Sequence, residues 1–273
     1  MLFLRPSGRV LFWTALTSLT ALVSRWVSDA VASYPRARQA GPLAACNPAA
    51  ARDEQRLADS PAWRIVEWLL VRRALTPFRE RPGFERLRIL NVDFGPGGVA
   101  VALRRQAPLD SVVVGTDSVS GMGDLALHRA RRRGAHRPLL LSQAWGHALP
   151  FRDGSFHLVV ASGALHGWIA PEQALAEIKR VLTPDGRYLV ADFRRDLPLP
   201  YWLVLQLVQT LFTPKDLRAL GEPRASVRAA YAPHEAEWLA GRAGLPQISL
   251  LPGIGWLMME RQGAASPRRY TLS

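Results

Sequence analysis

The sequence is poor in cysteine, in lysine and in long hydrophobic runs. Its 273 residues contain one cysteine, Cys46, which excludes an internal disulfide framework and offers no thiolate cluster for a metal. The apolar stretch at 10–23 covers 14 residues, short of the roughly 20 that a membrane-spanning helix needs. A hydrophobic content of 48% beside 21% charged residues is typical of a globular protein. We therefore expect a globular chain without a metal site.

The charge balance is strongly positive, with 35 Lys and Arg against 22 Asp and Glu. Lys179 and Lys215 are the only lysines, and the arginines are scattered along a chain that is also rich in Ala, Gly and Pro. The one dense arginine run, 129–133, precedes Gly134, which is typical of a helix C-terminus. This distribution disfavours a nucleic-acid partner. An anionic membrane surface is a more plausible partner for the positive charge than a nucleic acid.

The first sixty residues differ from the rest. The stretch 10–23 has arginines before it and Trp13 and Trp26 near its ends, as expected of a helix lying in a membrane interface. Ala30-Val31-Ala32 leaves a cleaved signal peptide open as an alternative. Residues 33–60 have little apolar periodicity and are interpreted as a linker. We therefore expect 1–60 to be an N-terminal helical extension and linker, followed by one domain over 61–262 and a tail over 263–273.

Short apolar runs alternate with amphipathic segments through this domain. Ser60-Pro61 is a favoured helix start. Predicted strands lie at 88–92, 111–115, 138–141, 156–161 and 188–191, and predicted helices at 99–106, 119–133 and 171–182. Such alternation predicts βαβ units, a parallel sheet and helices on both faces. Further on we expect a helix at 233–243 and a hairpin of 247–251 with 256–260. The apolar segment 199–212, within an insertion at 199–225, would cover the ligand side of the sheet.

A glycine-rich turn holding Gly95, Gly97 and Gly98 joins the first predicted strand to its helix. Glycines allow the backbone to approach a ligand, and the free N–H groups of the next helix point at it. Asp117 ends the second strand, twenty residues after Gly97. A carboxylate there can accept hydrogen bonds from both hydroxyls of a ribose, although it could also cap a helix that starts near Val119. The pair together favours a nucleotide-like ligand.

When five further motifs are considered with this pair, the chain resembles the class I S-adenosylmethionine-dependent methyltransferases, in the group that contains small-molecule and lipid methyltransferases. The resemblance covers roughly Phe84 to Asp196 and extends more weakly to Gln262. The motifs are Ala148-Leu149-Pro150-Phe151, Asp153-Gly154-Ser155-Phe156, Ser162-Gly163-Ala164-Leu165-His166, Glu177-Ile178-Lys179-Arg180 and Pro184-Asp185-Gly186-Arg187. The resemblance implies a Rossmann-like, doubly wound α/β fold with a mostly parallel seven-stranded sheet and an antiparallel C-terminal hairpin.

The resemblance also implies S-adenosylmethionine as the cofactor and a small-molecule acceptor. The residues it would place around the cofactor are Asn91, Asp93, Gly95, Gly97, Asp117, Ser118, Trp145, Gly146, His147 and Ser162. His166 follows the fourth strand and faces the expected acceptor, so it is a candidate general base, although a structural role for a lone histidine is as common. Trp168 and Tyr231 are candidate acceptor contacts.

Four positions depart from the family pattern. Asn91 stands where an acid is usual, Asp93 replaces a glycine, Trp145 replaces the acid that holds the adenine amino group, and His157 stands where aspartate is common. A left-handed Asp93 would cost roughly 1–2 kcal/mol, although aspartate tolerates that conformation better than most residues. Trp145 could stack on adenine instead of hydrogen-bonding to it.

The leading hypothesis is methyl transfer to a small lipophilic acceptor by a cytoplasmic enzyme, with peripheral membrane contact through 10–23 and 199–212. A cytosolic cofactor argues against export. The main alternative is a catalytically degenerate fold that serves as a binding or scaffold module. A third hypothesis, a nucleic-acid methyltransferase, predicts RNA or DNA binding that weakens steeply with salt.

Overall fold

The computed structural model describes residues 55–56, 58–79, 86–135, 137–197, 200–204, 207, 213–219, 221–222, 224–245, 248–252 and 255–261. The predictions for the apolar segment 10–23, for Cys46 and for the tail at 263–273 lie outside these residues. Within the described part of the chain, no helix combines the length and the apolar character needed to cross a bilayer.

Seven strands form one sheet in the order β3-β2-β1-β4-β5-β7-β6. Their bounds are β1 Arg88–Val92, β2 Val112–Asp117, β3 Leu140–Gln143, β4 Phe156–Ser162, β5 Leu182–Phe193, β6 Ile248–Pro252 and β7 Trp256–Arg261. The first five strands run parallel, and β7 is antiparallel to both of its neighbours. The predicted α/β sheet with an antiparallel C-terminal hairpin is confirmed.

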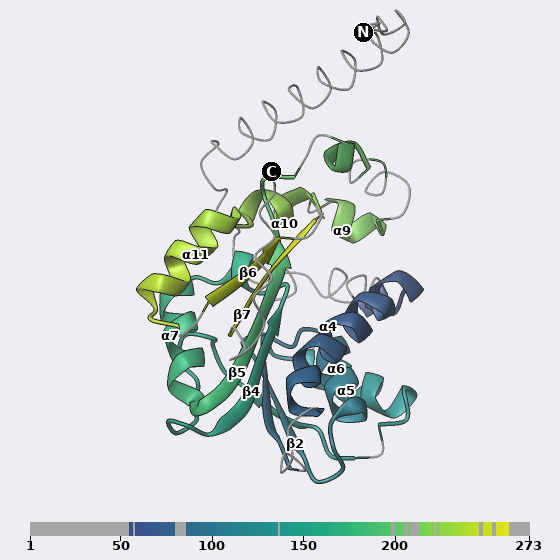
Figure 1. The fold of residues 1–273 in the computed structure, drawn as a ribbon. Coiled ribbons are helices and arrows are strands. Elements are labelled where there is room, and N and C mark those ends of the chain that lie inside the picture. Colours follow the sequence, from purple (N-terminus) through teal and green to yellow (C-terminus); the bar gives the residue numbers. More distant parts are fainter. Residues whose placement is uncertain are drawn as a thin grey trace, which may run out of the picture.

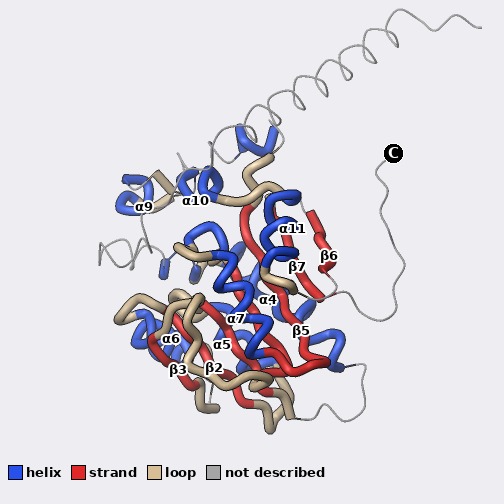
Figure 2. The backbone as a smooth tube through the Cα atoms, turned by 90° about the vertical axis from the view of Figure 1, so that its left-hand side faces the viewer, coloured by secondary structure: helices blue, strands red, loops and turns tan. Residues whose placement is uncertain are grey.

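Helices cover both faces of this sheet (Figures 1 and 2). One face carries α4 (Pro61–Arg79), α5 (Gly98–Gln106) and α6 (Met122–Arg132). The other carries α7 (Pro171–Val181) and α11 (Pro233–Arg242). Two short helices, α9 (Lys215–Ala219) and α10 (Arg224–Ala229), lie beyond one end of the sheet. There α10 packs against the 3-10 turn Leu165–Gly167 that follows β4.

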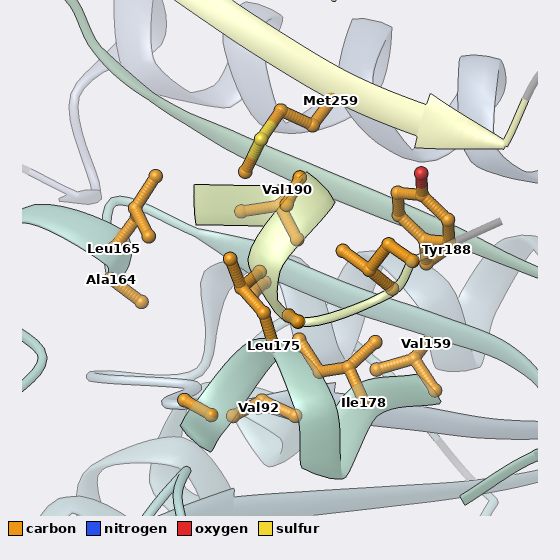
Figure 3. Packing of buried hydrophobic residues seen from close by; sticks show 14 of the residues in the cluster. Val92, Val159, Ala164, Leu165, Leu175, Ile178, Tyr188, Val190 and Met259 are labelled. Atoms are coloured by element: carbon orange, nitrogen blue, oxygen red, sulfur yellow. The ribbon is translucent and has the colours of Figure 1, made fainter. Parts of the chain in front are cut away.

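The sheet separates two hydrophobic cores because successive strand residues point to opposite faces. Ile89 packs with α4, α5 and α6, whereas its neighbours Leu90 and Val92 belong to the core under α7 and α11. Figure 3 shows this second core, in which Leu175 and Ile178 of α7 lie among strand residues. Strand β1 is therefore mostly apolar, since both of its faces are covered and four of its five residues are buried.

Local signals set most element ends. The Ser60 hydroxyl accepts a hydrogen bond from the Trp63 N–H at 3.3 Å, which confirms the predicted helix start. The starts of α6, β3 and β5 differ from the prediction. Helix α6 begins at Met122 instead of 119 because Gly121 is left-handed, with φ 88°. β3 begins two residues later than predicted, and β5 begins at Leu182 because that residue pairs with Phe156 beyond a register shift.

The predicted cover at 199–212 is described only at 200–204 and 207, all in helical conformation. Leu203, Val204 and Leu207 of this segment are more than half exposed. These apolar side chains thus face outward.

Candidate functional site

The predicted site residues converge where the parallel strands β1, β2, β4 and β5 end. Asp93 follows β1, Asp117 ends β2, Ser162 ends β4, and Asp192 is the penultimate residue of β5. Because the carboxyl ends of parallel strands meet at one edge of the sheet, these side chains share that edge. This is where ligands bind in open α/β sheets.

The loop between β1 and α5 has the backbone that its glycines predicted. Gly95 and Gly97 have φ of 53° and 85°, and Asp93, at φ 49°, is the one non-glycine residue of the described chain with a positive φ. A Cβ on Gly97 would lie 2.5 Å from Cβ of Ala126 in α6. The sequence resemblance assigned Gly97 to the cofactor, and the structure adds a second requirement, close packing of the loop on α6.

Asp117 ties this loop to the next one. Its Oδ2 accepts a hydrogen bond from the Gly95 N–H at 2.8 Å, and its Oδ1 accepts one from the Val119 N–H at 2.9 Å. Burial raises the pKa of this carboxyl, and the two backbone hydrogen bonds oppose that rise. Each oxygen retains a further lone pair. Asp117 therefore caps the turn, and it can still accept hydrogen bonds from the hydroxyls of a ribose.

Asp93 makes an unexpected contact with Trp168. Its Oδ2 accepts a hydrogen bond from the indole N–H of Trp168. Burial, reinforced by the negative charge of Asp117, raises the pKa of Asp93 from 3.8 to about 7, and the indole hydrogen bond opposes this. A Cβ on Gly146 would lie 3.3 Å from the indole nitrogen and 3.4 Å from Asp93 Oδ2. Trp168, predicted to contact the acceptor, thus lies against the glycine-rich loop between β1 and α5.

The loop after β3 carries the residues expected near the adenine. The ring centroids of Trp145 and His147 lie 5.8 Å apart, and Trp145 is 45% exposed, so its indole face is available for stacking. Ser118 is positioned through its carbonyl oxygen, which accepts a hydrogen bond from the Gln143 side chain at 3.1 Å. With glycine at 146, this loop passes close to Asp93 and Trp168.

Asn91 joins two central strands. Its side-chain N–H donates to the Val160 carbonyl at 3.0 Å. Its Oδ1 is buried without a hydrogen-bond partner among the described residues. An amide satisfies the neighbouring carbonyl, which a carboxylate could not do, so the substitution is compatible with the sheet.

His166 belongs to a buried pair that the sequence did not predict. Its Nδ1 lies 2.7 Å from Asp192 Oδ1, and its backbone N–H donates to Asp192 Oδ2, also at 2.7 Å. Asp192 is 1% exposed and also accepts the Phe193 N–H at 2.6 Å. In the tautomer in which Nδ1–H donates to Asp192, Nε2 is the nitrogen that can accept a proton. Such a carboxylate-held imidazole can act as a general base.

Two residues C-terminal to β5, Glu222 and Tyr231, are also buried. Glu222 is buried, which raises its pKa, while the Ser226 hydroxyl hydrogen bond and the positive field of His166 lower it. Tyr231, a predicted acceptor contact, is 8% exposed, and its carbonyl oxygen accepts the Arg195 N–H at 3.4 Å. The backbone of Tyr231 therefore lies beside the residues that follow β5, where it forms a parallel bridge with Arg194.

His157 lies at the opposite end of β4, away from this edge. Its Nδ1 accepts the Arg88 backbone N–H at 3.1 Å. Burial, together with the positive charge of Arg88, lowers its pKa. The neutral imidazole thus stabilises the start of two strands, in agreement with a strand-start role.

Sequence reasoning missed Asp192, Glu222 and the loop anchor Arg180. A signal existed for Asp192, because it is a polar residue at the end of a buried run, the position that pointed to Asp117. Arg180 donates five hydrogen bonds that fix the 147–153 loop to α7, to Glu177, Asp153 and two loop carbonyls. No sequence spacing pointed to Glu222.

Comparison with known proteins agrees with this geometry. Residues 90–190 match the model of the family described as "Methyltransferase domain". The chain is 31% identical over 195 residues to a ubiquinone/menaquinone biosynthesis C-methyltransferase of Paraburkholderia xenovorans, covering 71% of this chain and 72% of that protein. It is 38% identical over 106 residues to a demethylmenaquinone methyltransferase of Thermus thermophilus, covering 39% of this chain and 47% of the relative.

Solved structures share the fold at low sequence identity. A putative S-adenosylmethionine-dependent methyltransferase from Methanococcus maripaludis superposes with a TM-score of 0.55 at 15% identity, over 80% of this chain and 95% of that one. One from Aquifex aeolicus gives 0.54 at 16% identity, over 76% and 95%. The sheet order, the family match and the full-domain relative agree, and the chain belongs to the class I S-adenosylmethionine-dependent methyltransferases.

Proposed function

We propose that this protein transfers the methyl group of S-adenosylmethionine to a small lipophilic acceptor. The observation that carries the proposal is the meeting, at one sheet edge, of the partly buried Asp93 and the buried Asp117 with the buried His166–Asp192 pair. The carboxylates of Asp93 and Asp117 suit a cationic ligand that carries a sugar. The His166–Asp192 pair can accept a proton from a nucleophile.

The residues present fit the cofactor. Asp117 can still accept hydrogen bonds from ribose hydroxyls. Gly146, in the loop after β3, has no side chain, which leaves room for a flat base beside Trp145. Asp93, when ionised, would attract a positive charge. S-adenosylmethionine supplies an electrophilic methyl group on a sulfonium. The protein's task is to hold the acceptor in line, exclude water and receive a proton.

His166 is the group we assign to that proton. Asp192 orients the ring and stabilises the positive charge that the imidazole gains. Removing the proton from a phenolic, enolic or amine acceptor raises its nucleophilicity. An acidic acceptor would need less help, and the pair would then position it.

Aromatic side chains beside this pair support a lipophilic acceptor. The ring centroid of Phe193 lies 5.9 Å from that of His166 and 4.7 Å from that of Trp256. Trp63 of α4 follows at 5.5 Å from Trp256. All three aromatics are partly exposed. A flat apolar ring would gain contact area along this row. Two of the relatives are a ubiquinone/menaquinone biosynthesis C-methyltransferase and a demethylmenaquinone methyltransferase, which supports a quinone-like acceptor.

The test is transfer of labelled methyl from S-adenosylmethionine to a panel of quinols and phenols of increasing chain length. We expect turnover that rises with acceptor apolarity and falls strongly in Asp192→Asn. Turnover only on hydrophilic acceptors would contradict the acceptor class.

One observation favours the alternative of a module that no longer turns over. Asp93 and Trp168 contact each other at the cofactor loop, where the family pattern has glycine in place of the aspartate. The change Asp93→Gly separates the two hypotheses. Weaker cofactor binding in this variant indicates a working adaptation, whereas unchanged or newly gained binding indicates a decayed site.

A further inference from the structure

Five arginines line a cavity on the flank of the molecule formed by α4 and α6. The cavity measures about 390 Å³, and its charged lining consists of Arg64, Arg105, Arg129, Arg132, Arg133 and one acid, Asp59. None of these residues belongs to the loops at the carboxyl ends of the strands. The cavity nevertheless lies close behind the glycine-rich loop, since Nη1 of Arg129 is 2.9 Å from the position that a Cβ on Gly98 would take.

The inner arginines are held in place by acids. Arg129, 1% exposed, lies 3.2 Å from Asp59 and 3.7 Å from Glu67. Arg133 donates to Glu67 at 2.8 Å and to Asp59 at 3.3 Å. These contacts fix the guanidinium groups before any ligand arrives, which reduces the entropy lost on binding.

The outer arginines leave the cavity with excess positive charge. The side chains of Arg64 and Arg105 have no hydrogen bond or ion pair with any described residue. Arg132, 65% exposed, has Asp59 as its acid neighbour at 3.9 Å. Asp59 is thus shared among three arginines and Glu67 between two, and the two carboxylates cannot balance the five cations of the lining.

We propose that this cavity, the arginine pocket, binds a phosphate group carried by a soluble metabolite or by an anionic lipid. Guanidinium groups present paired N–H donors that match phosphate oxygens, so several converging arginines favour phosphate over a single carboxylate. The volume exceeds that of one phosphate ion and admits the group to which the phosphate is attached.

The exposed face of α4 lies beside the pocket and supports the lipid source. Ile65, Trp68 and Leu69 are 60%, 46% and 54% exposed, and the Arg72 guanidinium lies 5.2 Å from the Trp68 ring. Arg64 is on the same exposed face and also lines the pocket. Apolar and aromatic residues next to arginines are typical of helices that lie in a membrane interface.

The test uses the full chain, inorganic pyrophosphate as the soluble probe and vesicles of phosphatidylcholine with or without phosphatidylglycerol as the lipid probe. Calorimetry measures the first and cosedimentation the second. The double change Arg64→Gln with Arg105→Gln should weaken binding by about ten- to a hundredfold, because it removes charged hydrogen bonds. Neither side chain has a partner among the described residues, so the fold should be kept, and a thermal melt checks this.

The matched control is Arg86→Gln with Arg152→Gln, which removes the same charge from two exposed arginines outside the pocket. Pyrophosphate binding that falls only in the pocket variant supports a soluble phosphate ligand. Binding confined to phosphatidylglycerol vesicles, and weakened by the pocket variant and by Trp68→Gln, supports the lipid. The proposal is overturned if neither probe binds, or if the control weakens binding as much as the pocket variant.

Discussion

Replacing Asp93 by asparagine should make the protein more stable, by an amount that depends on pH. The pKa of this carboxyl is about 7 in the folded protein against an ordinary value of 3.8. Between these values the folded chain holds more protons than the unfolded chain. The free energy of unfolding contributed by Asp93 therefore falls as the pH rises from about 4 to about 7 and is constant above.

The size of the effect follows from the shift. About three pH units correspond to about 4 kcal/mol, which is the full cost of the buried charge at pH 8. Asparagine carries no charge, tolerates the left-handed backbone at φ 49° and keeps an oxygen for the Trp168 indole. We therefore expect the stability gain of Asp93→Asn to be larger at pH 8 than at pH 5 by about 2–3 kcal/mol.

The assay is urea unfolding of both proteins at pH 5 and at pH 8. Asp124→Asn, an exposed position in the first turn of α6, is the control and should show no such difference. A gain that is equal at the two pH values would refute the reasoning, because it would mean that Asp93 is not the titrating group. On the functional side, the same variant should bind S-adenosylmethionine more weakly than the native protein at pH 8, where Asp93 is ionised.

Three further changes test other parts of the structure. Asp192→Asn should lower kcat by about 10²–10⁴ and leave cofactor affinity unchanged if His166 is the base; a loss confined to KM would assign the pair to positioning. Arg180→Ala should lower the free energy of unfolding by about 2–3 kcal/mol, since five hydrogen bonds are lost, and exposed Arg152→Ala should not. Gly97→Ala should cost about 1–3 kcal/mol in urea unfolding through its left-handed backbone and its clash with Ala126; an unchanged midpoint would contradict this.

Strand and helix order were predictable because the buried strands are short apolar runs and because several helices have a capping residue, a proline or a glycine near their start. Ser60 and Gly121 illustrate the limit of such signals. Ser60 has a side chain that caps the helix and predicts its start, whereas Gly121 acts through its backbone angle alone. The early start of β5 was not predicted, and the strand contains Pro184 and Gly186, which are both unfavourable inside a strand.

The candidate site was predictable only where a residue's place in the chain fixed its place in space. Gly95, Gly97 and Asp117 follow strand ends, and the structure brings them together. The Asp93–Trp168 contact and the His166–Asp192 pair join residues 75 and 26 positions apart. Such contacts depend on neighbouring strands and on the turn after β4. No spacing in one sequence encodes them.

The most direct measurement is calorimetric titration of S-adenosylmethionine into the full chain, with Asp117→Asn and the exposed control Asp124→Asn. We expect saturable binding that weakens about tenfold or more in Asp117→Asn, through loss of charged hydrogen bonds, and is unchanged in the control. Absence of binding at millimolar cofactor, or equal binding by all three proteins, would contradict it.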